Sequence, residues 1–201
     1  IREGKILALG TDEEISQYIG ANTQVIELDG RTAIPGLIEG HGHFLSLGRE
    51  QQILDLSQAQ TFSEIVSQVA AAADSAAPGA WIFGRGWHQD KWLPEDLAAV
   101  DGAPINSPPN AVAPDNPVYL GHASGHAAFA NDAALAAAKI VDNTPDPEGG
   151  TFVRAADGRA TGLLRENAQD LVERSIADYM ALQTPETIQQ NLREQVQLAG
   201  N

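Results

Sequence analysis

Residues 33–44 read Ala33-Ile34-Pro35-Gly36-Leu37-Ile38-Glu39-Gly40-His41-Gly42-His43-Phe44. The apolar run before the histidines predicts a strand, and side chains two positions apart on a strand point to the same face. We therefore expect His41 and His43 to converge at the end of this strand, where two neutral imidazoles can hold a divalent metal ion. Gly40 and Gly42 leave room for the backbone to approach the ion.

A bare His-x-His pattern also arises by chance, so two unrelated histidines at an exposed strand end are the alternative. The preceding sequence adds context. Residues 4–10 predict a short strand closed by glycine, and residues 25–29 predict a second one. Between them, Thr11 and Glu14 have the spacing of a capping box, which predicts a short helix. Pro35-Gly36 then separates this stretch from the strand that carries the histidines.

Further motifs follow in a fixed order. They are Gly84-Arg85-Gly86-Trp87-His88, Pro117-Val118-Tyr119-Leu120, Ser124-Gly125-His126, Asn131 before Ala134-Leu135, Gly149-Gly150-Thr151-Phe152, and Thr161-Gly162-Leu163-Leu164-Arg165-Glu166-Asn167-Ala168. As an ordered set, with the His-x-His motif, they resemble the amidohydrolase superfamily, most closely its YtcJ-like branch. Two positions depart from the family pattern: Glu39 and Ser124 each stand where the family often has Asp.

The resemblance implies an α/β fold: the start of a metal-dependent hydrolase (β/α)8 TIM-like barrel with an inserted α/β segment, preceded by part of a small β-sandwich domain. Residues 1–34 would belong to the small β-rich domain, and residues 35–201 to the N-terminal part of the barrel, with the insertion at about 52–165. Family members carry a bridging carboxylated lysine, two later histidines and a catalytic aspartate. None is assigned here, so the catalytic residues are expected beyond Asn201, and the isolated 201-residue chain is expected to be inactive.

Within this family pattern, His41 and His43 are the metal ligands. Zinc, as one or two ions, suits imidazole ligands, and iron or manganese remain alternatives. The resemblance also implies that His126, Trp87 and Glu166 bind substrate. Each has a structural alternative: a histidine bonded to a loop carbonyl, a core tryptophan, and an acidic residue in the first turn of a helix. His122 lies outside the matched pattern, and a structural or solvent-exposed role is expected for it.

The resemblance implies hydrolysis of a C–N bond, in an amide, lactam or related group, by metal-activated water. Two alternatives stay open. One is a non-catalytic binding or assembly module, and the other is a metallohydrolase that cleaves C–O bonds in lactones or esters. The resemblance implies a small-molecule substrate, and a homo-oligomer is left open.

Composition excludes several classes. Of 201 residues, 43% are hydrophobic and 19% charged, which is ordinary globular usage. The net charge of −15 with only 12 Lys and Arg argues against nucleic-acid binding, and no apolar run has the ~20 residues of a membrane span. The absence of cysteine excludes thiolate ligands and disulfides. The cytoplasm is the favoured compartment, although an N-terminal signal is not assessable.

The remaining patterns predict alternating strands and helices, with a proline-dense stretch at 94–117 that is expected to contain neither regular helix nor central strand. The expected elements are a strand at 54–56, a helix from Thr61, a strand at 81–84, a strand at 117–120, a helix capped by Asn131, a hairpin over 152–164 turning at Asp157-Gly158, and helices at 168–180 and 184–199.

Overall fold

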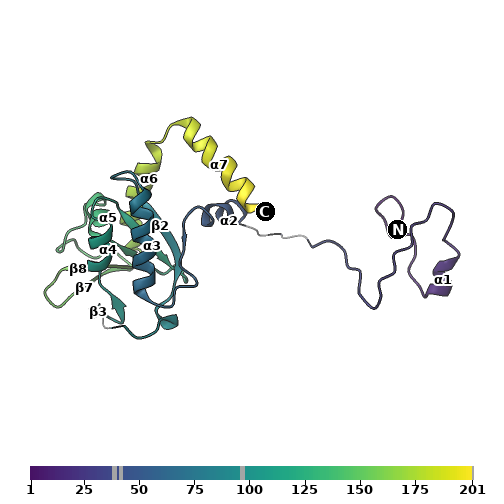
Figure 1. The fold of residues 1–201 in the computed structure, drawn as a ribbon, viewed down its shortest axis with the longest axis horizontal. Helices are drawn as coiled ribbons and strands as arrows, with labels where there is room; N and C mark the ends of the chain where they lie inside the picture. Colours follow the sequence, from purple (N-terminus) through teal and green to yellow (C-terminus); the bar gives the residue numbers. More distant parts are fainter. Residues whose placement is uncertain (38–39, 41–42, 96–97, 201) are drawn as a thin grey trace. The chain divides into compact units, whose positions relative to one another are not determined.

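A computed structural model describes residues 1–37, 40, 43–95 and 98–200. The chain divides into two compact units, residues 1–42 and residues 43–201 (Figure 1). In the first unit, helix α1 (Asp12–Ser16) begins after Thr11. The Thr11 hydroxyl accepts a hydrogen bond from the Glu14 amide, and the Glu14 carboxylate accepts one from the Thr11 amide at 2.8 Å. The predicted capping box is therefore confirmed.

The strands expected at 4–10 and 25–29 are absent from the described residues, and the strand expected before the histidines lies mostly outside them. Among the described residues of the first unit, strand pairing is limited to an isolated bridge between Arg2 and Lys5. A strand is stabilised by a neighbouring strand and by burial of one face. Here, large hydrophobic side chains such as Ile6 and Ile26 are exposed, so neither condition is met. The assignment of residues 1–34 to a small β-rich domain stays a prediction.

The second unit is built on a six-stranded mixed sheet in the order β1-β2-β5-β6-β8-β7. The β1–β2 and β2–β5 pairs are parallel, and the other pairs are antiparallel. The strands are β1 (Leu54–Asp55), β2 (Ile82–Trp87), β5 (Val118–His122), β6 (Ala127–Ala130), β7 (Gly150–Arg154) and β8 (Ala160–Glu166), with a separate pair β3 (Ala99–Val100) and β4 (Ala103–Pro104). The α/β class and the parallel part of this sheet agree with the start of a metal-dependent hydrolase barrel.

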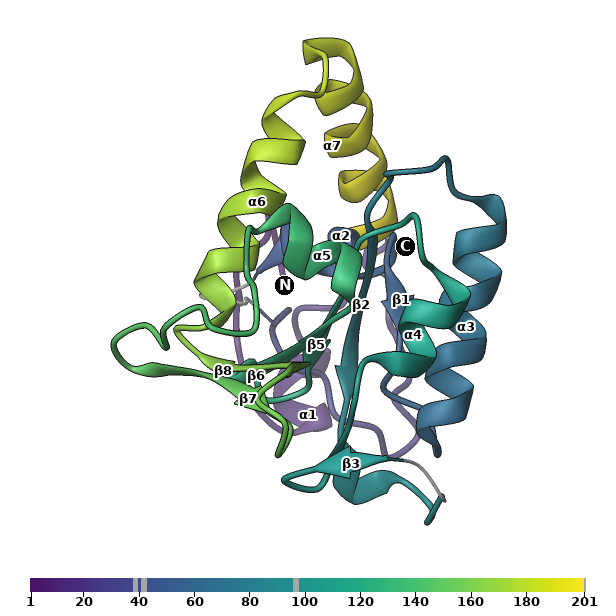
Figure 2. The same ribbon diagram turned by 90° about the vertical axis from the view of Figure 1, so that its left-hand side faces the viewer.

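Helices cover both faces of the sheet (Figure 2). The helices are α2 (Phe44–Glu50), α3 (Phe62–Ser75), α4 (Ser107–Val112), α5 (Asp132–Ala137), α6 (Gln169–Ala181) and α7 (Pro185–Ala199), with a 3-10 helix η1 (Gln89–Lys91). Adjacent strand residues point to opposite faces. Leu163 accordingly packs in a core cluster with α3, whereas Leu164 packs in a second cluster with α5 and α6.

The predicted helix starts and the hairpin are confirmed. The Thr61 hydroxyl caps α3 by accepting from the Glu64 amide at 3.1 Å, and β7 pairs with β8 around Asp157-Gly158. The expectation of no regular helix at 94–117 was wrong, because α4 forms there with prolines in its first turn. A proline is tolerated at that position, where its missing N–H has no partner within the helix anyway.

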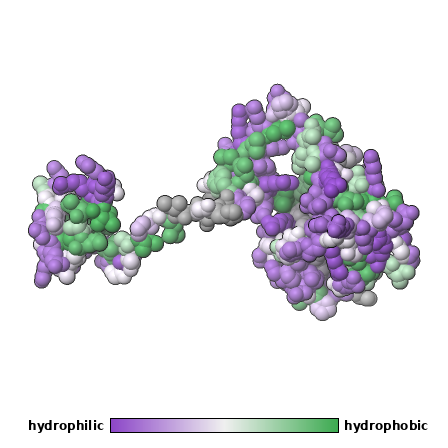
Figure 3. Space-filling view, turned by 180° about the vertical axis from the view of Figure 1, so that it is seen from behind, coloured by the Kyte–Doolittle hydropathy of each residue, from purple (hydrophilic) through white to green (hydrophobic). Residues whose placement is uncertain are grey.

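Helices α2 and α7 pack together at Gly48, where a Cβ atom would lie only 1.9 Å from the Gln195 carbonyl oxygen. Apolar side chains gather over these two helices on the surface seen in Figure 3, including exposed Phe44, Leu47, Ile188, Leu192 and Val196. None of the helices in the described ranges has both the length and the hydropathy needed to cross a membrane.

Candidate functional site

Three strands of the second unit end at the same edge of the sheet. Strand β2 pairs parallel with β5, and β6 runs antiparallel to both β5 and β8, so β2, β5 and β8 run in the same direction. Their last residues are Trp87, His122 and Glu166, and His88 follows Trp87 directly. In open α/β sheets, ligands bind outside the carboxyl ends of the strands. This carboxyl edge is therefore the candidate functional site.

A β-bulge directs the end of β2 toward this edge. The pairing with β5 shifts register between Arg85 and Trp87. Gly86 lies between them with φ of +101°, and a Cβ atom there would lie 3.2 Å from Ser57. Beyond the bulge, the Trp87 carbonyl accepts a hydrogen bond from the Ala123 amide at 2.9 Å. The bulge therefore ties β2 to the loop that follows β5.

His122 is buried and held on both ring nitrogens. Its Nδ1 atom accepts from the Ser124 amide at 3.1 Å, and its Nε2 atom lies 3.1 Å from the Gln89 side-chain oxygen. Because Nδ1 is an acceptor, the proton is assigned to Nε2, which donates to Gln89. Burial lowers the pKa of His122 below its usual value, the nearby His88 adds to this, and Asp90 opposes it. The ring is therefore neutral at pH 7.

His126 and Glu166 meet at the exposed rim of the same edge. The His126 Nδ1 atom lies 3.0 Å from Glu166 Oε2, and the two side chains are 71% and 56% exposed. A second contact pairs their backbones, since the Glu166 amide donates to the His126 carbonyl at 2.9 Å. Glu166 has φ of +48°, in the left-handed region that non-glycine residues rarely adopt. Such strained positions cluster at functional sites.

Trp87, the third predicted substrate contact, lies in the core. Its side chain is 4% exposed, and its indole N–H donates to the Leu120 carbonyl at 2.8 Å. Its ring packs edge-on against the His122 ring with centroids 4.6 Å apart. The structure thus brings His126 and Glu166 together at the rim and places Trp87 in the core, against the His122 ring.

A cavity of about 280 Å³ opens beside this edge. His122 and Gly125 line it together with Arg85, Tyr119, Gln169 and Glu173. The Tyr119 hydroxyl donates to the Glu173 carboxylate at 3.0 Å. Burial raises the pKa of Tyr119 far above its usual value, and the negative charge of Glu173 adds to this. Tyr119 therefore stays protonated and presents a fixed dipole to the cavity.

Arg85 is one of two arginines that line this cavity, with Arg49. Its guanidinium forms an ion pair with Glu50, at the end of α2. A second cavity of about 660 Å³ lies on the side of β1 and shares Arg85 and Glu50 in its lining. Arg85, Tyr119 and Glu173 were not singled out from the sequence as contacts. Arg85 lies on β2 and Tyr119 on β5, and Glu173 lies on α6, the helix that follows β8. These positions in the sequence were the signal that could have marked them as contacts.

The predicted metal ligands are only partly described. His41 lies outside the described residues, as does Glu39, so the convergence of the two imidazoles remains a prediction. His43 is exposed and occupies the N-cap position of α2. Within the described ranges, no group of three or more His, Cys, Asp or Glu side chains is arranged to hold a metal ion. The histidines of the carboxyl edge therefore do not form a complete metal site by themselves.

A family model described as "Amidohydrolase family" matches residues 24–200. The chain is 37% identical over 172 residues to the Arabidopsis thaliana protein LONG AFTER FAR-RED 3, and 35% identical over 178 residues to YtcJ of Bacillus subtilis. It is 31% identical over 171 residues to an N-substituted formamide deformylase of Arthrobacter pascens. These matches cover 86%, 88% and 84% of the chain but only 28%, 32% and 30% of the relatives, so the chain spans less than a third of their length.

A crystal structure of a metal-dependent hydrolase from Pyrococcus horikoshii is similar in fold. It matches with a TM-score of 0.52 at 22% identity, over 99% of this chain and 35% of that one. The mixed α/β arrangement of the described residues thus recurs within a larger hydrolase fold.

Proposed function

The chain belongs to the amidohydrolase family, and we propose that it forms part of a metal-dependent hydrolase that binds a small-molecule substrate at the carboxyl edge of β2, β5 and β8. The observation that carries this proposal is the pairing of His126 with Glu166 at that edge, 3.0 Å apart and exposed. An exposed, strained and mutually oriented pair at strand ends is more readily explained by ligand contact than by stability, since exposed ion pairs contribute only ~0–1 kcal/mol.

In this proposal His126 contacts the substrate directly. A carboxylate can only accept hydrogen bonds, so His126 donates from Nδ1–H to Glu166, and in the tautomer with that single proton Nε2 is an acceptor. That nitrogen can accept a hydrogen bond from a substrate N–H. Glu166 fixes the ring orientation, in the way that carboxylates orient functional histidines in other sites. Trp87 acts indirectly, by packing under the His122 ring.

His41 and His43 are the proposed metal ligands, with zinc as the proposed ion. A divalent ion bound there would polarise the scissile carbonyl and lower the pKa of a bound water toward ~7. Two imidazoles supply only half of a four-coordinate shell, and catalytic sites need about three protein ligands plus water. The proposal therefore requires further ligands in addition to His41 and His43.

The proposed bond is C–N. One supporting fact is that a relative is named for N-substituted formamides, which are amides. A matched pair of substrates tests this choice against the C–O alternative: N-ethylformamide and ethyl formate differ only in the atom that leaves. The assay uses the protein as its gene encodes it, loaded with zinc, and compares each enzymatic rate with the uncatalysed rate. A larger acceleration for the ester would overturn the C–N assignment.

Substitutions test whether His41 and His43 hold the catalytic metal. We expect His41→Ala with His43→Ala to abolish turnover and stoichiometric zinc binding together, while Asp74→Asn, on the exposed side of α3, leaves both unchanged. Unchanged turnover in the double variant would mean that the metal site is misassigned. No turnover of either substrate by the zinc-loaded protein would instead favour the non-catalytic binding module.

A further inference from the structure

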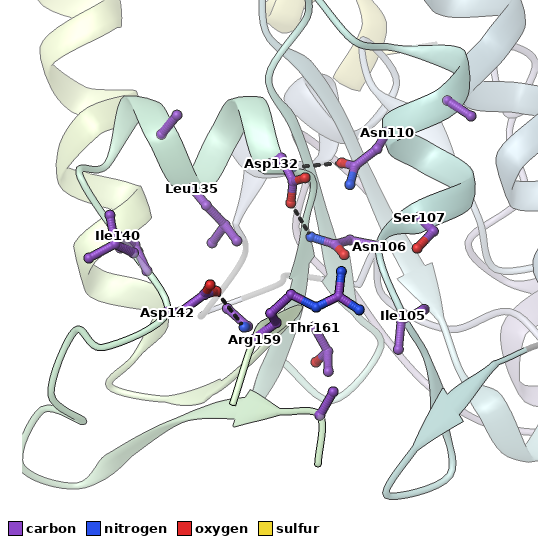
Figure 4. Close-up of a pocket in the computed structure, with 15 residues that line it drawn as sticks. Ile105, Asn106, Ser107, Asn110, Asp132, Leu135, Ile140, Asp142, Arg159 and Thr161 are labelled. Atoms are coloured by element: carbon purple, nitrogen blue, oxygen red, sulfur yellow. Dashed lines mark hydrogen bonds between the residues drawn. The ribbon is translucent and has the colours of Figure 1, made fainter. Parts of the chain in front are cut away.

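A cavity of about 660 Å³ lies away from the carboxyl edge, between α4, α5 and the turn of the β7–β8 hairpin (Figure 4). Ligand pockets of small molecules commonly measure ~300–1,000 Å³. Leu135 and Ile140 supply apolar surface, and three charged residues, Asp132, Asp142 and Arg159, surround it. The proposed hydrolase reaction uses none of these side chains.

The two carboxylates are held in place by the protein and each keeps a free oxygen. Oδ1 of Asp132 accepts from the Asn106 side-chain amide at 2.6 Å, and Oδ1 of Asp142 accepts from the Ala160 backbone amide at 2.9 Å (Figure 4). No hydrogen bond within the described ranges reaches Oδ2 of either aspartate. Both side chains are therefore oriented by one oxygen while the other is available to a donor from a ligand.

Arg159 provides the opposite charge. Its Nε atom donates to Asp157 Oδ2 at 2.8 Å, which fixes the start of the guanidinium group. Its two terminal nitrogens have no hydrogen-bond partner among the residues that the structure describes, and in Figure 4 the guanidinium extends from the hairpin toward Asn106. A guanidinium with two free donors matches a carboxylate.

Asn106 holds the Asp132 carboxylate at the wall of the cavity. Its residue is 7% exposed, its backbone amide donates to the Thr161 carbonyl at 2.9 Å, and its side-chain nitrogen donates to Asp132. Its side chain lines the cavity, so the amide that orients Asp132 also forms part of the cavity wall.

We propose that this cavity binds a small zwitterion of the α-amino acid class. Arg159 would contact the carboxylate, Asp132 and Asp142 the ammonium group, and Leu135 with Ile140 an aliphatic side chain. The two acidic groups and one basic group favour a ligand that carries both charges. A simple anion would be repelled by the carboxylates of Asp132 and Asp142, because it brings no positive charge to pair with them. The proposal is independent of the hydrolase reaction and of its metal.

Three probes that share the leucine side chain test the proposal by isothermal titration calorimetry: L-leucine, 3-methylbutylamine without the carboxylate, and 4-methylpentanoate without the amine. We expect leucine to bind at least about tenfold more tightly than either partial ligand, because charge-assisted hydrogen bonds form at both ends. Absence of saturable leucine binding, or equal binding of leucine and the amine, would overturn it.

Single substitutions locate the binding. We expect Arg159→Gln to weaken leucine at least about tenfold while leaving the amine unchanged, and Asp142→Asn to weaken leucine and the amine but not the acid. Both side chains are at the surface, so folding is not at risk, and circular dichroism checks this. Arg193→Gln on α7 and Asp74→Asn on α3 change the same charges away from the cavity. Equal effects of these controls and the cavity variants would show that only net charge matters.

Discussion

His126 Nδ1 lies 3.0 Å from Glu166 Oε2, although the two residues are 40 positions apart in the chain. Strand β6 begins directly after His126, and β8 ends at Glu166, so the antiparallel pairing of these two strands places the residues opposite each other. The sheet therefore holds the pair at the carboxyl edge, where the hydrolase substrate is proposed to bind.

The function of Glu166 can be separated from its effect on stability. Glu166→Gly removes an exposed pair worth ~0–1 kcal/mol and a strained φ that costs ~1–3 kcal/mol. We expect the free energy of unfolding to fall by no more than about 1 kcal/mol, or to rise. Turnover by the protein as its gene encodes it should fall ~10–100-fold. Glu166→Gln keeps an acceptor and should lose less activity. Urea denaturation and initial rates measure the two effects; an unfolding loss that parallels the activity loss would contradict the assignment.

His122 predicts a pH dependence of stability. Burial lowers its folded-state pKa below the ordinary value of 6.5, so unfolding takes up a proton at acid pH. The neutral His122 ring therefore contributes its full stabilisation above the pKa that His122 has in the unfolded chain. This contribution is lost as the pH falls through the lower pKa of His122 in the folded protein. We expect the protein to lose stability below pH ~6.5, and His122→Asn to have a shallower acid slope. Urea denaturation between pH 7.5 and 5 measures the slope, and NMR titration of the ring checks the pKa. A midpoint above 6.5 would refute the prediction.

Gly162 and Gly158 have similar backbone conformations but differ in the space available to a side chain. Both have positive φ, +86° and +88°, but a Cβ atom at 162 would lie 2.2 Å from the Ala130 carbonyl oxygen, whereas nothing lies within 4 Å of one at 158. We expect Gly158→Ala to cost ~1 kcal/mol from its backbone conformation, and Gly162→Ala to cost at least ~2 kcal/mol more because β6 must move. Thermal or urea unfolding measures both. Equal costs would mean that the close approach of β8 to β6 is not tight.

Asn131 connects the start of α5 to β5 from a side chain that is 1% exposed. Its oxygen accepts from the amides of Val118 and Ala134, and its nitrogen donates to the carbonyls of Ala113 and Asn116. Asn131→Asp would set a buried carboxylate oxygen against two carbonyls. We expect a loss of more than ~3 kcal/mol in unfolding free energy, against less than ~0.5 kcal/mol for Asn143→Asp in an exposed turn. A loss below 1 kcal/mol would show that the network relaxes.

Zinc titration tests the proposed share of the metal site in this chain. His41 and His43 supply two imidazoles, whereas a zinc ion needs about four ligands. The 201-residue chain should therefore bind zinc weakly and show no hydrolase activity. The protein as its gene encodes it should bind zinc tightly and be active. Calorimetry on both, with His41→Ala and His43→Ala combined in the gene-encoded protein, measures the difference. Tight stoichiometric binding by the short chain would place the missing ligands within it.

Local patterns predicted much of the second unit and one helix cap of the first. The caps at Thr11, Thr61 and Asn131 and the turn at Asp157-Gly158 were readable because a cap or a tight turn depends on residues three or four positions apart. The strands expected at 4–10 and 25–29 failed for the converse reason. A strand needs a partner and a buried face, and alternation of side chains does not state whether either exists.

The sequence by itself determined the family, the α/β class, the starts of the main helices and the identity of His126 and Glu166 as candidates. Only the tertiary structure decided that these two side chains meet, that Trp87 lies in the core against His122, and that Asp132, Asp142 and Arg159 surround one cavity. The reason is that capping, turns and helical faces arise from neighbours in the chain. Burial and the pairing of distant side chains depend on which strands the sheet sets side by side, and residue spacing does not encode that order.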